Sequence, residues 1–198
     1  MATIAIPTWF KPASFSLRMS TNQRMFSSNF GGSEQVADML NDRWMATLTL
    51  PARINTEGGA LEALIASFRG QTNTCNLWHM QRPVPRGTMR GIPATTSNPA
   101  AQGTATIGIA TSIGATLLAG DMIGAGGLLL QVAEDCTADG IGLLTVPLVN
   151  RLRKSIAVGS PVTWDKPTAP FRLMTNASVL YQPGYAEGVS LDFAEAIA

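Results

Sequence analysis

The most reactive side chains in this sequence are two cysteines, Cys75 and Cys136, and a single histidine, His79. A cysteine nucleophile needs a base such as histidine within hydrogen-bond reach. If residues 74–79 form a strand, Cys75 and His79 share a face but lie about 13 Å apart, which is too far. Two thiols and one imidazole also cannot complete a four-ligand zinc site without carboxylates. We therefore predict two reduced, buried cysteines, no metal site and no cofactor.

Two loops match ligand-binding motifs only in part. In Gly124–Gly127 the third glycine of a dinucleotide-binding fingerprint would fall on Leu129, and no Lys-Ser or Lys-Thr pair follows. The segment Glu134–Gly140 carries carboxylates but lacks the ligand spacing and the final carboxylate of a calcium loop. We predict a tight hairpin turn and a polar β-turn at these places. No G-x-S-x-G sequence is present either, and we predict that the protein is not an enzyme.

Three arginines, Arg82, Arg86 and Arg90, recur every four residues in the segment MQRPVPRGTMRG. Pro83 and Pro85 fix the backbone φ angle and remove hydrogen-bond donors, which predicts an extended, exposed loop. The arginines of such a loop either face solvent or bind an anion or the carboxylates of a partner. We treat them as candidate partner contacts.

The composition excludes several classes of protein. Charged residues make up 14% of the chain, against about 25% in an average soluble domain, and a net charge of +1 argues against a nucleic-acid-binding surface. The best apolar run, Ile107 to Ala119, has thirteen residues, whereas a membrane helix needs about 20. The N-terminal residues carry no charged region before an apolar stretch, so we expect no secretory signal. We predict a protein made and kept in the cytoplasm, without membrane insertion.

Alternation of apolar and polar residues predicts β-strands along most of the chain. The expected strands cover residues 14–19, 24–30, 43–50, 74–79, 102–109, 121–123, 128–133, 143–146, 160–164, 168–174 and 189–194. Glycine-bearing turns separate the short strands between residues 102 and 165, a pattern typical of a small barrel or sandwich. The last strands are expected to rejoin the first sheet, which makes the middle of the chain an insertion.

One segment has the periodicity of a helix. Thr56 is a candidate N-cap, and Arg69-Gly70 is a typical helix end, so we predict a helix over about residues 57–69. Its apolar side chains recur at i, i+3, i+4 and i+7 and form a core stripe of Leu61, Leu64, Ile65 and Phe68. A single stripe of large residues needs a sheet to cover it.

In this order, the segments resemble the distal tail (Dit-like) proteins of long-tailed bacteriophages. The similarity covers about residues 40–175 and rests on the order of several short segments. These are Trp44–Pro51, Leu61–Gly70, Leu77–Trp78, Pro83–Gly87, Leu118–Ile123, Gln131–Gly140, Val146–Leu148 and Phe171–Leu173. Members of such families carry a helix ending in Leu-Arg-Gly and a Gly-Asp-Tyr strand start; here these are Phe68-Arg69-Gly70 and Gly120-Asp121-Met122.

The resemblance implies a mainly β fold: a tail-tube-like β-sandwich with one flanking α-helix and an inserted, small, barrel-like β-domain. We expect residues 1–95 to form the first part of the sandwich, residues 96–166 the insertion, and residues 167–198 the strands that complete the sandwich. The implied function is structural. A homohexameric ring in the virion tail would join the tail tube protein to the hub or tip proteins of the baseplate, around the channel through which DNA passes during genome ejection.

Two other functions remain open from the sequence. The chain could be a tail tube subunit or another minor tail protein, which copy number would separate from a single ring. It could also be a carbohydrate-binding module of a tail, with Trp164 or Trp78 stacking on sugar. In the ring, Arg82, Arg86 and Arg90 are expected near a partner or the channel lumen.

Overall fold

A computed structural model describes residues 2–29 and 31–197 of the chain. The fold is mainly β, and the described residues form several sheets and one helix, which confirms the fold class expected from the sequence. The chain divides into two compact units. The first takes the residues up to Met19, Arg43–Gln81 and the residues from Ala169 on, and the second takes Ser20–Asp42 and Arg82–Thr168.

The first unit is built on a six-stranded sheet with the order β1-β5-β14-β17-β3-β2. Its strands are β1 (Thr3–Ile4), β2 (Ser14–Ser27), β3 (Glu34–Thr49), β5 (Thr74–Leu77), β14 (Ala169–Leu173) and β17 (Ser190–Glu195). The two C-terminal strands, β14 and β17, lie in the centre between β5 and β3, with Phe171 opposite Cys75 and Phe193 opposite Ala46. The C-terminal strands therefore complete a sheet that the N-terminal strands begin.

The two faces of this sheet differ in polarity because the sequence alternates along each strand. One face is buried and apolar; it contains Trp44, Ala46, Leu48, Leu77, Phe171, Leu173, Leu191 and Phe193. The other face carries polar side chains, including Thr47 and Asp192, which form a hydrogen bond of 2.7 Å. The predicted set of Trp44, Ala46, Leu48 and Leu50 is buried as a group.

The helix α1 spans Asn55–Ser67, and its side chains Leu61 and Leu64 are buried. Just beyond its end, the ring of Phe68 meets the ring of Phe193 edge-on at 5.6 Å between centroids. Ile65, the fourth residue of the predicted stripe, is half-buried. The helix therefore covers the apolar face of the sheet with the side chains that helical periodicity indicates.

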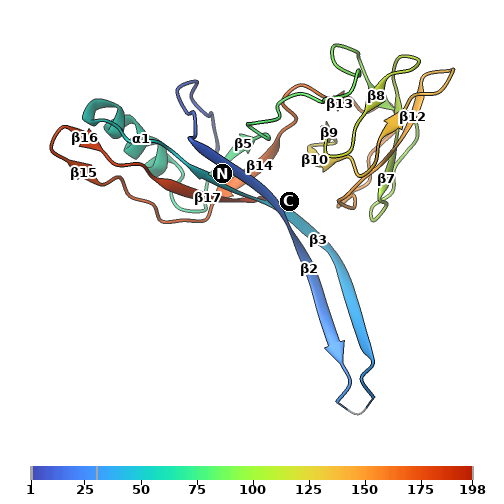
Figure 1. Cartoon of the computed structure of the whole chain (residues 1–198), viewed down its shortest axis with the longest axis horizontal. Helices are drawn as coiled ribbons and strands as arrows, with labels where there is room; N and C mark the ends of the chain where they lie inside the picture. The colour runs from blue at the N-terminus through green and yellow to red at the C-terminus, as the bar shows by residue number, and fades with distance from the viewer. Residues whose placement is uncertain (1, 30, 198) are drawn as a thin grey trace. The chain divides into compact units, whose positions relative to one another are not determined.

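The start of the helix differs from the prediction. Its N-cap residue is Ile54, which makes no side-chain capping hydrogen bond, so Thr56 lies inside the helix. The helix begins directly after β4 (Arg53–Ile54), which pairs with β16 (Tyr185–Ala186) next to β15 (Tyr181–Gln182). Because β4 ends at Ile54 and the helix begins at Asn55, the last residue of the strand takes the N-cap position. Figure 1 shows α1 beside the β15–β16 hairpin.

The second unit contains three small sheets. Their strands are β6 (Thr95–Thr96), β7 (Thr106–Ala110), β8 (Thr116–Leu117), β9 (Met122–Ala125), β10 (Leu128–Gln131), β11 (Cys136–Thr137), β12 (Leu143–Pro147) and β13 (Val162–Thr163). The sheet orders are β10-β9-β13, β12-β7-β6 and β11-β8. All three contribute to one apolar cluster that includes Ile109, Ile123, Leu130 and Leu144. Gly126 and Gly127 have positive φ angles between β9 and β10, as the predicted hairpin turn requires.

The second unit begins earlier in the chain than the expected insertion at residue 96. The segment Arg82–Arg90 is bound to the β8–β9 turn, with Met89 completely buried. The carboxylate of Asp121 accepts hydrogen bonds from the backbone N–H groups of Arg86 and Gly87, at 2.9 and 3.2 Å. The predicted exposed loop is therefore a strap on the second unit, and only the side chains on its outer face reach solvent.

The N-terminal strands are longer than predicted. Residues 24–30 were expected to form a separate strand, but β2 continues without a break to Ser27; Phe30 lies outside the described residues. A turn closed by the hydrogen bond from Ser28 N–H to Ser33 O, 2.9 Å, leads into β3, which runs for 16 residues. The outer parts of these two strands, residues 20–27 and 34–42, are called the arm below (Figure 1).

Candidate interaction surfaces

The side chains with redox or metal-binding chemistry do not form a site in the described part of the chain. No group of three or more His, Cys, Asp and Glu residues there is placed to hold a metal ion. Cys75 is buried, and burial raises the pKa of its thiol to about 12. Cys136 is half-buried, and the pKa of its thiol is raised mainly by burial. Both cysteines are free thiols, and a thiol with a raised pKa is a poor nucleophile at neutral pH.

The predicted arginine contacts lie on the outer face of the strap, and all three residues are exposed. Arg82 donates to the carbonyl of Gly120 at 3.0 Å. Arg86 donates to the carbonyl of Ala119, and Arg90 donates to the carbonyl of Gly87 at 3.2 Å. The guanidinium groups of Arg82 and Arg86 thus hold the strap to the β8–β9 turn of its own unit, whereas that of Arg90 donates within the strap. The sequence pattern did not indicate these internal roles. Their contact with a partner or a channel stays a prediction.

The arm is the most exposed part of the described chain. Every residue from Gln23 to Asn29 and from Gly31 to Val36 is exposed, on both faces of the ribbon. The arm also carries large apolar side chains in solvent, and Met25, Phe26 and Val36 are 64%, 58% and 56% exposed. A two-stranded ribbon is marginally stable alone, and its open edges and apolar side chains are suited to contact with another chain.

The arm could have been recognised from the sequence by its turn. The sequence Ser-Ser-Asn-Phe-Gly-Gly of residues 27–32 stands between two strand-like segments, and such a turn sequence is a signal for a hairpin. The polar stretches Ser20–Gln23 and Asn41–Arg43 hide the continuation of both strands, because exposed ribbons lack the apolar alternation that burial imposes.

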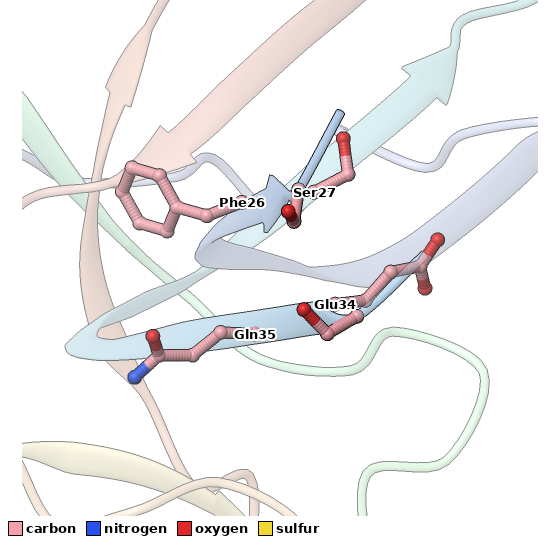
Figure 2. Close-up of a pocket in the computed structure, with 6 residues that line it drawn as sticks. Phe26, Ser27, Glu34 and Gln35 are labelled. Atoms are coloured by element: carbon pink, nitrogen blue, oxygen red, sulfur yellow. The ribbon is translucent and has the colours of Figure 1, made fainter. Parts of the chain in front are cut away.

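A shallow hollow lies at the end of the arm, lined by Phe26, Ser27, Ser28, Ser33, Glu34 and Gln35. Figure 2 shows that the side chains of Phe26 and Glu34 point in different directions rather than toward a common centre. A binding site for a small molecule is normally enclosed and has converging polar groups. The hollow therefore has the character of a contact surface.

Two further surfaces of the first unit are exposed. The polar face of the six-stranded sheet carries Thr47, Asp192 and Thr175, which are joined by hydrogen bonds. On the β15–β16–β4 sheet, Ile54 and Tyr185 are opposite each other and are 60% and 43% exposed. The first surface offers polar groups, whereas the second offers apolar ones.

The tryptophans considered for sugar stacking are both half-buried. Trp164 is half-buried and packs against the apolar cluster of the second unit. Trp78 is also half-buried, directly after β5. A stacking platform requires a ring face open to solvent, and the packing of Trp164 is that of a structural side chain.

No protein-family model matches this sequence, and the comparison with curated proteins gives no match either. Among the described residues, no helix has the length and apolar character needed to cross a membrane.

Proposed function

We propose that this protein is a structural subunit of a bacteriophage tail, a distal tail protein whose copies form a ring in the virion. The ring would be a homohexamer that joins the tail tube to the hub or tip proteins of the baseplate, around the channel for DNA. The subunit would be made in the cytoplasm of the bacterial host. This proposal includes no catalytic role.

The arm is the observation that carries the proposal. β2 is an edge strand of its sheet, and the part of it that belongs to the arm, residues 20–27, corresponds to a ribbon about 26 Å long. An exposed ribbon of this length, with Met25, Phe26 and Val36 in solvent, makes an isolated protein prone to associate, because open strand edges can pair with another chain. Contact with a neighbouring subunit would cover both the edges and the apolar side chains.

The remaining surfaces support a ring. In a cyclic assembly each subunit must offer two different patches, one to each neighbour. The arm is one candidate, and the apolar pair Ile54 and Tyr185 belongs to another. The polar sheet face with Thr47 and Asp192 suits a water-filled channel, since its side chains need no apolar cover.

The alternative positions in the tail can be separated by counting. One ring contains about six copies per virion, whereas a tube contains many rings. Quantitative mass spectrometry of purified virions would give the ratio of this protein to a known portal or capsid protein. A ratio of tens of copies would replace the distal ring by the tube, and absence from virions would contradict both.

The role of the arm is tested by the variant Met25→Ser/Phe26→Ser/Val36→Ser. We expect this protein to keep its melting temperature, because the three side chains are exposed, but to remain monomeric in sedimentation experiments. A matched control is Ile113→Ser/Ile141→Ser, which removes two side chains of the second unit that are 69% and 78% exposed. Equal assembly of both variants and of the unmodified protein would contradict the proposal.

A further inference from the structure

We infer that Arg151 and Arg153 are positioning residues that hold the arm in a fixed direction against the rest of the second unit, to which the arm belongs. The inference rests on the proposed role of the arm in assembly. Arg151 Nη2 lies 2.8 Å from Asp38 Oδ2, and Arg153 Nη1 donates to the backbone carbonyl of Asp42 at 2.7 Å. Both contacts join the β3 part of the arm to residues that follow β12.

The two arginines are presented by a rigid segment. Between them, Leu152 is completely buried, and its N–H donates to Thr104 O at 2.9 Å. Before them, the buried Asn150 donates from Nδ2 to Leu129 O at 3.0 Å and accepts from Gln131 N–H at 3.0 Å. Asn150 and Leu152 are buried, whereas Arg151 is exposed and Arg153 half-buried, so the anchored residues leave the two arginine side chains nearer the surface.

The arm offers a matching surface. Asp38, Leu40 and Asp42 alternate along β3 and so belong to one face of the strand. Leu40 is half-buried, and its Cδ2 lies 3.7 Å from where a Cβ at Gly103 would stand. The carboxylate of Asp42 also accepts a hydrogen bond from Asn22 N–H at 3.1 Å, which links the partner strand β2 to the same place. The contact thus combines an ion pair, a charged hydrogen bond and an apolar side chain.

Fixing the arm has a consequence for assembly. A ribbon free to swing must lose that freedom when it binds, and this loss of entropy weakens association. A ribbon already held in its binding direction avoids most of the loss. Loss of the Arg151 and Arg153 contacts should therefore weaken assembly without changing the surface that the arm presents to its partner.

The direct test measures the distance between the arm and strand β12 of the same unit by pulsed electron paramagnetic resonance. Spin labels are placed on cysteines at Gln35 and Thr145, both exposed, in a Cys136→Ser background, and the labelled protein is diluted into unlabelled protein. Cys75 is buried and resists labelling. We expect a narrow distance distribution, which broadens markedly in Arg151→Glu/Arg153→Glu.

Two further variants make the result specific. Lys154→Glu reverses the charge of an exposed residue next to Arg153 and should leave the distance distribution between the two labels narrow. The exchange Asp38→Arg/Arg151→Asp restores an ion pair with opposite polarity and should give a narrow distribution again. The concentration for half-assembly should rise severalfold to tenfold in Arg151→Glu/Arg153→Glu.

An unchanged narrow distribution in Arg151→Glu/Arg153→Glu would overturn the inference, whatever the variant's assembly. A broadened distribution with unchanged assembly would support the positioning of the arm by these arginines, but would contradict the proposed role of the arm in the ring. The two proposals can therefore fail separately.

Discussion

At the scale of single residues, the two adjacent glycines of the helix have opposite roles. A Cβ on Gly58 would stand 2.6 Å from Ala186 Cβ and 3.0 Å from Tyr181 Cε1, whereas a Cβ on Gly59 would meet nothing within 4 Å. Gly58 therefore permits the close packing of α1 on the β15–β16 hairpin. In the sequence alone, both glycines indicate only a low helix propensity in the first helical turn. Their difference could not be predicted, because the hairpin that packs on Gly58 is formed by residues more than 120 positions away.

We predict that Gly58→Ala destabilises the protein by about 1–3 kcal/mol, because the added methyl group overpacks a tight contact. Gly59→Ala should stabilise it by about 0.5–1 kcal/mol, because alanine is the better helix former. Denaturant unfolding of both variants gives the comparison. Equal free energies of unfolding for the two variants would show that the helix does not pack closely on the hairpin.

The buried thiol of Cys75 makes the free energy of unfolding depend on pH in the alkaline range. Its thiol has a pKa of about 12 in the folded protein, against 9.0 for an unperturbed thiol. Above pH 9 the unfolded chain therefore releases a proton that the folded chain retains. The thiol contribution to stability is constant below pH 9 and decreases between pH 9 and 12, by about 1.4 kcal/mol per pH unit at most.

The measurement is the free energy of unfolding between pH 8 and 11 for the unmodified protein and for Cys75→Ala. We expect the unmodified protein to lose stability more steeply with pH, because tyrosines and lysines titrate equally in both proteins. Parallel curves would mean that the Cys75 thiol ionises in the folded state as readily as in the unfolded state.

At the scale of elements, periodicity predicted the helix and most strands because each buries one face. The apolar stripe of α1 and the buried set from Trp44 to Leu50 follow directly from spacing. The strap and the arm were predicted poorly for the opposite reason. The strap is held by backbone hydrogen bonds to Asp121, and the outer part of the arm, residues 23–29 and 31–36, is exposed on both faces, so neither leaves an apolar pattern in the sequence.

The helix gives a stability prediction with an internal control. Phe68 is 1% exposed and meets Phe193, so Phe68→Ala should cost about 3–5 kcal/mol. Ile65 is half-buried, and Ile65→Ala should cost clearly less, about 1–2 kcal/mol. Thermal unfolding of both variants tests the order; a smaller effect at Phe68 than at Ile65 would contradict the packing of the helix on the sheet.

The strap gives a second prediction at this scale. Asp121 is buried and its Oδ2 accepts from Gly87 and Leu118 N–H, while the exposed Asp135 accepts from Ala119 N–H with one oxygen, Oδ1. Asp121→Asn exchanges an acceptor for a donor and leaves a backbone N–H unpaired, at a cost of about 2–4 kcal/mol. Asp135→Asn keeps its acceptor and should cost less than about 1 kcal/mol. A similar loss from both substitutions in denaturant unfolding would exclude a special role for Asp121.

At the scale of the whole molecule, the proposed assembly depends on two exposed apolar surfaces. The arm presents Met25, Phe26 and Val36 to solvent, and a separate small sheet presents Ile54 and Tyr185. Two different apolar patches on one chain favour head-to-tail contacts, which close into a ring if the rotation between subunits permits. The low charge of the sequence reduces the cost of removing water from such contacts.

The most direct test is the mass of the purified protein in solution, measured by native mass spectrometry over a range of concentrations. We predict a closed assembly of six chains, which has a mass of about 125 kDa for a subunit of 20.9 kDa. A protein that stays at the mass of one chain at every concentration, with the arm intact, would contradict assembly through its own surfaces.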